Sequence, residues 1–383
     1  MKFLLLIISV LTLTAHATYV YVPVTINHAK VQETNTYFPW TVDLSRFPAA
    51  WWALVHTRGN IFVKDSLGNN IHRIVDSVNF AADSGTVTIL AQTDILYDKH
   101  YRIGVSADSN KANYADVFGA CNGISRWSMH GSGTLITDDC GGYNGVASAN
   151  CQTGQPGWMR RGIHLYGNPA DISTGNISQL QNVAHFTITT VVKVPSPSTI
   201  VATISFWSDG EKLFYDGFNS NQIYLTVNNF AGANYTSLGA PNNYATSWFG
   251  TSWCLNSFIY DGTQSEVSRI KSYVNSSVMV LAKTGTIAPL SGTFAGAPYM
   301  IGRPDYAQDM YIAEQRIYSD SKSAGWIATE YNNLFDVTAT TIGSVLDTQT
   351  TTVPGNNSGL PIGIVTVIGI GIGLGFRLLK RSR

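Results

Sequence analysis

An uncharged apolar run close to the C-terminus constrains this chain more than any other feature. The run extends from Leu360 to Phe376 and is followed by a basic end that contains Arg377, Lys380, Arg381 and Arg383. Roughly 20 apolar residues cross the hydrocarbon core of a bilayer, and flanking arginines can reach the headgroups. A buried core helix, the alternative, would need a polar domain after it, and only RLLKRSR follows. The sequence therefore predicts a transmembrane helix over residues 359–379 and a cytoplasmic basic tail over residues 380–383.

A second apolar run opens the chain and has the pattern of a secretory signal peptide. It follows Lys2, reads FLLLIISVLTLT, and ends at the small-x-small triplet Ala15-His16-Ala17. This pattern predicts cleavage after Ala17 and removal of residues 1–17. Together the two runs predict a single-pass type I protein of a cell or viral envelope membrane, with residues from 18 to about 358 outside that membrane.

The composition favours strands and excludes one class of partner. Charged residues make up 13% of the chain and the formal net charge is zero, so no basic field exists to hold nucleic acid. Aromatic residues, threonine, asparagine and glycine are abundant, which is typical of strands and turns rather than helices. An exported part of about 340 residues is long for one domain and fits two.

Four cysteines lie in the exported part, where disulfides can form: Cys121, Cys140, Cys151 and Cys254. More than one pairing is possible. Cys140 and Cys151 enclose a short loop whose closure costs little entropy, so we predict a bond between these two and a second bond between Cys121 and Cys254. A metal site is disfavoured because no CxxC pair occurs and no histidine lies at ligand spacing from a cysteine.

Short strand-like runs dominate the chain up to residue 118. Examples are YVYVPVTI from Tyr19 and TVTILA from Thr86, and the second run follows a turn in which Gly85 can adopt a positive φ. No segment here has a sustained helical period. The pattern predicts a small antiparallel β-sandwich over residues 18–118.

The rest of the exported part alternates between loops and further strands. Residues 119–160 are rich in Gly, Asn, Asp and Cys and indicate long loops, after which strand-like runs resume. A helix is predicted over residues 321–335, where apolar side chains recur at helical spacing. Residues 338–358 are rich in Thr, Ser, Asn and Gly, and predict a flexible stalk. The expected fold is all-β, with two β-sandwich domains and one C-terminal transmembrane helix.

Four patches between about residues 120 and 335 occur in a recognisable order. They are Trp127-Ser-Met-His130 with Gly133-Thr134 and the Asp-rich turn to Gly145, FTITTVVKV from Phe186, Trp253 with Tyr260-Asp261-Gly262 and Tyr273-Val274-Asn275, and IAEQRIY from Ile312 with the helix to Asn332. In these patches the chain resembles the laminin-G-like domain, a two-sheet jelly roll of the concanavalin A-like lectin fold. The resemblance implies a jelly roll over residues 119–337.

Residues 19–118 resemble the uncharacterised β-domain that often precedes laminin-G-like domains in bacterial, archaeal and phage surface proteins. The resemblance is carried by GNIFV from Gly59, with Asp65 and Gly68, and by YRIG from Tyr101. Both regions depart from the family patterns, because Asn60 and Ala313 replace aspartates and Ser276 replaces a glycine. These departures weaken any inherited cation-binding or turn role but are compatible with the expected strands.

The concanavalin A-like fold also contains glycoside hydrolases, which use two carboxylates. A retaining pair lies about 5 Å apart, so acidic residues two or four positions apart on one strand would supply it. The nearest candidate, Asp209-Gly-Glu211, lies in a turn-like segment and is better explained as a solvated turn. No nucleophile elbow or phosphate loop occurs, and we predict no catalytic activity.

Carboxylates at two places could bind calcium. Asp138 with Asp139, and Asp305 with Asp309, offer oxygen ligands, although an aspartate that caps a turn is the simpler interpretation. We therefore expect no cofactor, with calcium as the alternative.

A polar, aromatic segment between residues 228 and 248 has the composition of a sugar-binding loop. Sugars stack their C–H faces on aromatic rings and form hydrogen bonds with amide side chains. The predicted ligand-binding residues are Tyr235, Asn242, Asn243, Tyr244 and Trp248, although a loop with buried aromatic ends would look the same. Trp253 is excluded because the resemblance implies that it lies on a core strand.

These features favour a membrane-anchored recognition or adhesion protein that binds a glycan or a surface protein through its lectin-like domain. A virion or cell-envelope structural spike is the first alternative, and a glycoside hydrolase is the second. Glycines in the apolar segment, Gly369 with Gly373 and Gly371 with Gly375, would permit helix contact in a homo-oligomer.

Overall fold

The computed structural model of this chain describes most of the exported part. The described residues are 20–76, 78–105, 114–159, 161–181, 183–195, 201–208, 211–219, 222–227, 237–239, 250, 252–284, 287, 289–290, 298–303 and 308–346. The predicted signal peptide, the transmembrane segment and the basic tail lie outside these ranges. Within them, no helix has the length and apolar character needed to span a bilayer.

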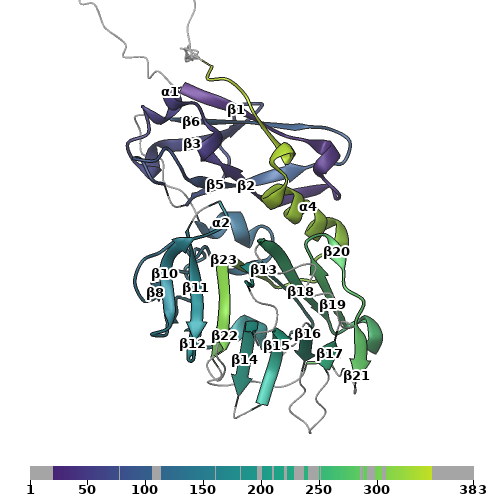
Figure 1. The fold of residues 1–383 in the computed structure, drawn as a ribbon. Coiled ribbons are helices and arrows are strands. Elements are labelled where there is room, and N and C mark those ends of the chain that lie inside the picture. Colours follow the sequence, from purple (N-terminus) through teal and green to yellow (C-terminus); the bar gives the residue numbers. More distant parts are fainter. Residues whose placement is uncertain are drawn as a thin grey trace, which may run out of the picture. The chain divides into compact units, whose positions relative to one another are not determined.

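The N-terminal sandwich consists of two antiparallel sheets in the described residues (Figure 1). The four-stranded sheet has the order β24-β1-β6-β3, with β1 Val20–Ile26, β3 Ile61–Asp65, β6 Lys99–Val105 and β24 Thr340–Ile342. The three-stranded sheet has the order β2-β5-β4, with β2 Asn35–Asp43, β4 Arg73–Val75 and β5 Thr86–Thr93. The strands expected from the alternating runs at Tyr19 and Thr86 are confirmed as β1 and β5.

Strand β24 belongs to the N-terminal sandwich although it is the last strand of the described chain. It pairs with β1, and Ile342 lies opposite Val24. Farther along, Leu346 bridges Tyr21. The prediction of a stalk from residue 338 was wrong for this stretch, because backbone pairing at a sheet edge needs no hydrophobic period. The rest of the predicted stalk lies outside the described residues.

The jelly roll also consists of two antiparallel sheets. The eight-stranded sheet, called here the central sheet, has the order β10-β11-β23-β13-β18-β19-β20, and β7 also pairs with β23. Its strands are β7 Gly123–Trp127, β10 Cys151–Pro156, β11 Arg161–Gly167, β13 His185–Lys193, β18 Cys254–Asp261, β19 Ile270–Val274, β20 Ser277–Val278 and β23 Gln308–Tyr318. The nine-stranded sheet consists of β8 Leu135–Ile136, β9 Gly145–Ala147, β12 Ala170–Ser173, β14 Val201–Ser208, β15 Glu211–Asn219, β16 Gln222–Val227, β17 Ser237–Gly239, β21 Ala282–Thr284 and β22 Tyr299–Arg303.

The two faces of the central sheet belong to different hydrophobic clusters. Its inner face, with Ile188, Phe258 and Ile312, packs against the nine-stranded sheet. On its outer face, Val191 and Leu255 join the cluster of the N-terminal sandwich. Strand β13 is therefore buried on both faces, and its threonines Thr187, Thr189 and Thr190 are buried together with its apolar residues.

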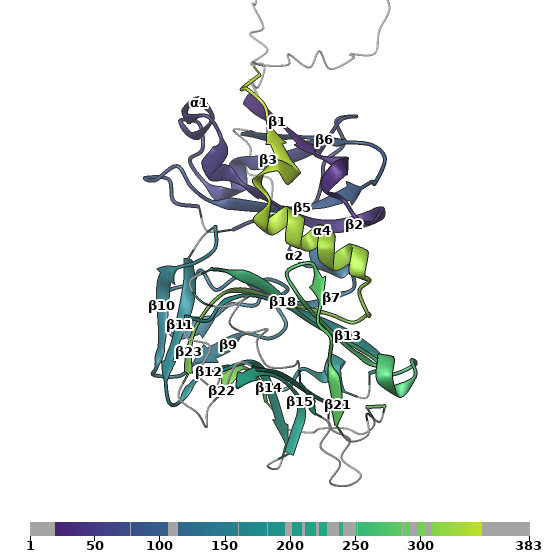
Figure 2. The ribbon, with the colours of Figure 1, turned by 45° about the vertical axis from the view of Figure 1, so that its right-hand side comes forward.

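Two of the helices, α2 and α4, lie between the two sandwiches (Figure 2). The α-helices in the described residues are α1 Ala49–Trp52, α2 Tyr114–Gly119 and α4 Ala324–Phe335. The short 3-10 helices are η1 His28–Lys30, η2 Leu44–Arg46, η3 Arg58–Asn60, η4 Ser178–Leu180, η5 Glu266–Ser268 and η6 Val337–Ala339.

Helix α4 follows the last strand of the jelly roll and packs on the N-terminal sandwich. The Ser323 hydroxyl caps its start by accepting a hydrogen bond from the backbone N–H of Trp326. The Asn333 side chain pairs with the backbone of Thr41 in β2 through one bond of 2.9 Å and one of 2.8 Å. The predicted helix is confirmed, but its buried face includes Trp326 and Glu330, whereas Ala324 is exposed.

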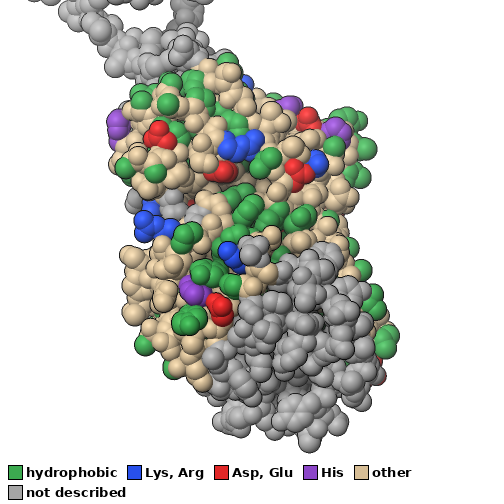
Figure 3. Space-filling view, viewed as in Figure 1, with side chains coloured by type: hydrophobic (Ala, Val, Ile, Leu, Met, Phe, Trp, Pro, Cys, Tyr) green, Lys and Arg blue, Asp and Glu red, His purple; other side chains and the backbone are tan. Residues whose placement is uncertain are grey.

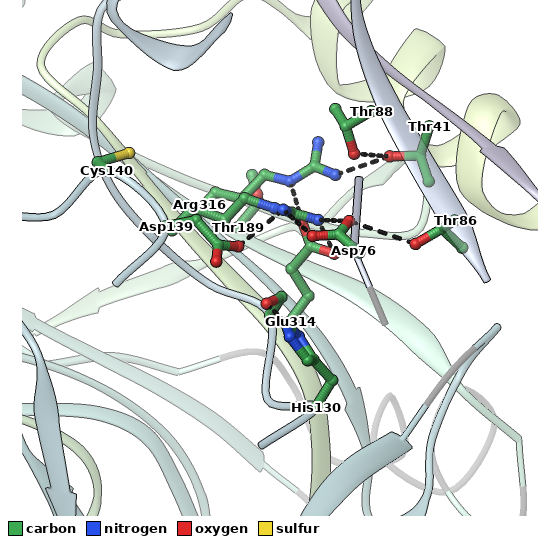
Figure 4. Close-up of polar contacts among 12 residues, drawn as sticks. Thr41, Asp76, Thr86, Thr88, His130, Asp139, Cys140, Thr189, Glu314 and Arg316 are labelled. Atoms are coloured by element: carbon green, nitrogen blue, oxygen red, sulfur yellow. Dashed lines mark hydrogen bonds and ion pairs between the residues drawn. The ribbon is translucent and has the colours of Figure 1, made fainter. Parts of the chain in front are cut away.

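A buried arginine joins the two sandwiches. Arg126, on β7 of the jelly roll, is fully buried and donates bidentately to Asp76 at the end of β4, with both distances 2.9 Å. It also donates to Asp139 at 2.8 Å and to Glu314 at 2.7 Å. Burial opposes the charge of Arg126, but the carboxylates of Asp76, Glu314 and Asp139 more than offset it and raise its pKa above the ordinary value. Figure 4 shows the three carboxylates converging at one point.

A second buried arginine extends this network towards α4. Arg316, two residues beyond Glu314 on β23, donates to Glu314 at 2.5 Å and to Glu330 of α4 at 2.9 Å. Its guanidinium also reaches the Thr41 hydroxyl in β2 at 3.3 Å (Figure 4). Isolated buried charges are costly, so this paired arrangement fixes one relative placement of β4, β7, β23 and α4.

The four cysteines are free, and the predicted disulfides are not formed. Cys121 belongs to the N-terminal hydrophobic cluster, whereas Cys254 belongs to the jelly-roll cluster. Cys140 and Cys151 likewise pack against different clusters, so each predicted pair would join side chains that the fold holds apart. The short loop between Cys140 and Cys151 is therefore not a sufficient basis for predicting a disulfide.

We predict that Arg126→Met lowers the free energy of unfolding by about 3 to 5 kcal/mol, because it removes the guanidinium that three buried carboxylates share. Of these three, Glu314 also pairs with Arg316, so the main loss falls on Asp76 and Asp139. Lys30→Met is the matched control: Lys30 pairs with Asp336 at 2.7 Å, but the two side chains are 35% and 28% exposed. Lys30→Met should lower the free energy of unfolding by less than about 1 kcal/mol. Urea denaturation followed by fluorescence measures both, and equal losses would contradict the role given to Arg126.

We also predict that the cysteines resist alkylation in the folded protein. Burial raises the pKa of the Cys121 and Cys140 thiols to about 12, so both stay protonated and poorly nucleophilic at pH 8. Iodoacetamide should label all four cysteines only after denaturation, with no reductant added. A disulfide-linked peptide in the mass spectrum would contradict the structure.

Candidate functional site

The loop predicted to bind ligand lies outside the described residues. Tyr235, Asn242, Asn243, Tyr244 and Trp248 all fall in the stretches 228–236 and 240–249. The structure therefore does not test this prediction.

The outer face of the central sheet is covered only in part. Along β23, every residue from Ile312 to Tyr318 is buried, whereas Asp309 and Tyr311 near its start are half-buried. On the neighbouring β11, His164 is half-buried and Tyr166 is 57% exposed. The N-terminal sandwich and α4 thus leave one end of this face open to solvent.

Six side chains of the open end form what we call the outer-face cluster. It consists of Lys193, Trp253, His164, Tyr166, Asp309 and Tyr311. Strand pairing aligns them: His164 lies opposite Tyr311, which lies opposite Lys193, and Tyr166 lies opposite Asp309. In Figure 3, histidine, acidic and basic side chains gather among hydrophobic ones over β11 and β23.

The rings of the cluster pack closely on one another. His164 and Tyr311 are stacked, with 4.0 Å between ring centroids and 2° between ring planes. Tyr166 lies 5.4 Å from His164 on one side, and Trp253 packs edge-on at 6.4 Å from Tyr311 on the other. Side chains that project from the same face of adjacent strands form such a row, because cross-strand neighbours lie within contact distance of each other.

The same row also contains polar side chains that are held by contacts with their neighbours. His164 Nε2 lies 2.8 Å from Asp309 Oδ1, and the two side chains are 13% and 30% exposed. The Lys193 ammonium lies 5.4 Å from the centre of the Tyr311 ring. The cluster therefore combines apolar ring surface with a carboxylate, an imidazole, an ammonium and phenolic hydroxyls, which can all form hydrogen bonds with a ligand.

The carboxylates considered above for catalysis or calcium binding have structural roles where the structure describes them. Asp138 accepts hydrogen bonds from the backbone N–H groups of Arg126, Cys140, Gly142 and Tyr143, so it organises a turn as expected. Asp139 pairs with Arg126. Asp209 and Asp305 lie outside the described residues. Among those described, no three His, Cys, Asp or Glu side chains are grouped to hold a metal.

Sequence reasoning missed the outer-face cluster. It assigned Trp253 to a core strand, but this side chain is half-buried, lies just before β18 and packs against the hydrophobic cluster of the N-terminal sandwich. The signal that was available is local: HLY at 164–166 and DMY at 309–311 both place an apolar core residue between aromatic or charged ones.

Comparisons with known proteins give a partial likeness of fold. No family model and no curated protein matches the chain. Solved structures that resemble it include the receptor-binding domain of botulinum neurotoxin C/D mosaic serotype, with 13% identity and a TM-score of 0.44 over 55% of this chain and 51% of that one. The binding domain of Paraclostridial Mosquitocidal Protein 1 is another example, with 12% identity and a TM-score of 0.45 over 58% of this chain and 54% of that one.

A Trypanosoma rangeli sialidase in complex with sialic acid is a third example, with 12% identity and a TM-score of 0.42 over 69% of this chain and 44% of that one. The chain thus spans about half the length of these proteins. At such identities and TM-scores, what those proteins bind is not transferred to this chain.

Proposed function

We propose that this protein is a surface recognition protein that binds glycans through its jelly roll, and that it acts by binding rather than by catalysis. The observation that carries the proposal is the outer-face cluster. The exposed ring of Tyr166, next to the His164–Asp309 pair, provides the two kinds of contact that sugar rings need: stacking for C–H faces and hydrogen bonds for hydroxyls.

The way the face is left open supports this role. An apolar ring such as Tyr166, 57% exposed, gains stability from burial, and nothing in the described part of the chain covers it. In the same sheet, the outer face from Ala313 to Tyr318 is closed by the N-terminal sandwich. The open end is therefore the part of the sheet that can receive a ligand.

We further propose that the apolar segment at residues 359–379 anchors the protein in a membrane. The sequence supports this proposal, because the run from Leu360 to Phe376 is uncharged and is followed by a basic end with Arg377, Lys380, Arg381 and Arg383.

We predict that Tyr166→Ala weakens glycan binding by about 1 to 3 kcal/mol if the ring is a central contact. The thermal midpoint should change little, because this side chain is mostly exposed. Tyr37→Ala is the matched control: Tyr37 is 51% exposed but lies on β2 of the N-terminal sandwich. Binding of the full-length protein in detergent to a broad glycan array, followed by titration of the best ligand, measures the effect.

Two results would contradict the proposal. If wild type binds no glycan on the array and cross-linking shows a multimer, the structural spike is the better explanation. If Tyr166→Ala and Tyr37→Ala bind equally well, the ligand contacts another surface.

A further inference from the structure

We propose that a cavity between the two sandwiches binds the anionic group of an acidic saccharide, a sugar that carries a carboxylate or a sulfate. The cavity has a volume of about 690 Å³ and is lined by Arg58, Asn79, Phe80, His130, Met159 and Arg161, among others. This volume is within the usual range for ligand sites, about 300 to 1,000 Å³. It is separate from the outer-face cluster, with which it shares no residue.

The charge of the cavity is positive. Arg58 on η3 and Arg161 at the start of β11 are both exposed, and neither forms an ion pair with a described residue. No carboxylate lines the cavity. Asp76 and Asp139, which lie close by in sequence, are held by Arg126, and Asp83 is not one of the lining residues.

The walls are fixed by the buried network described above. One wall is the turn from Val78 to Gly85, which follows Asp76 and is closed by an Asn79–Ser84 bridge. Because Arg126 of the jelly roll holds Asp76, it also holds this turn against the opposite wall. In that wall Met159 has a φ of 56°, a left-handed conformation that costs energy in a bulky residue.

The lining chemistry points to a saccharide acid. A guanidinium presents a planar fork of donors that matches a carboxylate or sulfate in two parallel hydrogen bonds. Phe80 is 44% exposed and offers a ring for C–H contact, while Asn79 and Ser84 offer polar groups for hydroxyls. The assignment to a sugar, rather than to another acid, rests on the proposed glycan-binding function.

The test uses full-length protein in detergent and three defined probes: sialyllactose, a sulfated heparin disaccharide and neutral lactose. Titration calorimetry should show binding of one or both acidic sugars that weakens with added salt. Arg161→Gln and Arg58→Gln should each lower the affinity roughly tenfold or more, because each removes charge-assisted hydrogen bonds. The matched control is Arg102→Gln, which removes an arginine that stacks on Tyr21 away from the cavity.

The outcomes separate this site from the outer-face cluster. Loss of acidic-sugar binding in the arginine variants but not in Tyr166→Ala supports the cavity, even if no ligand is found for the cluster. Unchanged affinity in both arginine variants, with unchanged thermal midpoints, overturns the proposal. Equal affinity for lactose and the acidic sugars, or binding of polyglutamate in place of all the sugars, overturns it as well.

Discussion

The buried ion-pair network centred on Arg126 is the constraint on which the rest of the structure depends. A guanidinium that is removed from water requires carboxylate partners, and here they come from β4, from the loop after Ile136 and from β23. Hydrophobic contact alone would let the two sandwiches slide against each other, since it has no direction. Charge-assisted hydrogen bonds have strict geometry and select one arrangement. The cluster of buried apolar residues around α2, α4 and the outer face of the central sheet then fills the remaining space.

Both candidate binding surfaces follow from this arrangement. Docking of the N-terminal sandwich covers the outer face of the central sheet from Ala313 to Tyr318 and leaves the row with His164 and Tyr311 open. The same docking places the turn after Asp76 beside Met159 and Arg161, and so creates the cavity. Strand β24 completes the connection, because it returns the chain from the jelly roll to the edge of the first sheet. The recognition surfaces are thus consequences of how two ordinary β-sandwiches meet.

Local patterns in the sequence predicted the strands and the helix, because alternation and helical spacing are properties of neighbouring residues. They predicted β1, β5, β13 and α4 from a few residues each. Contacts such as His164 with Asp309, or Arg126 with Asp76, depend on strand register and domain docking, which no local pattern contains. Charged side chains are usually exposed, so nothing marked Arg126 as buried. Strands β7 to β10 were missed because glycine, asparagine and cysteine between residues 119 and 160 resemble loop composition.

The Arg126 network and the hydrophobic cluster to which both sandwiches contribute should make the two sandwiches one cooperative unit. Differential scanning calorimetry of the detergent-solubilised protein tests it most directly. If the Arg126 network and β24 join the sandwiches, the exported part unfolds in one transition, and its calorimetric enthalpy equals its van't Hoff enthalpy. Two separate transitions, each with the enthalpy of a single sandwich, would show that the domains are independent and would contradict the account.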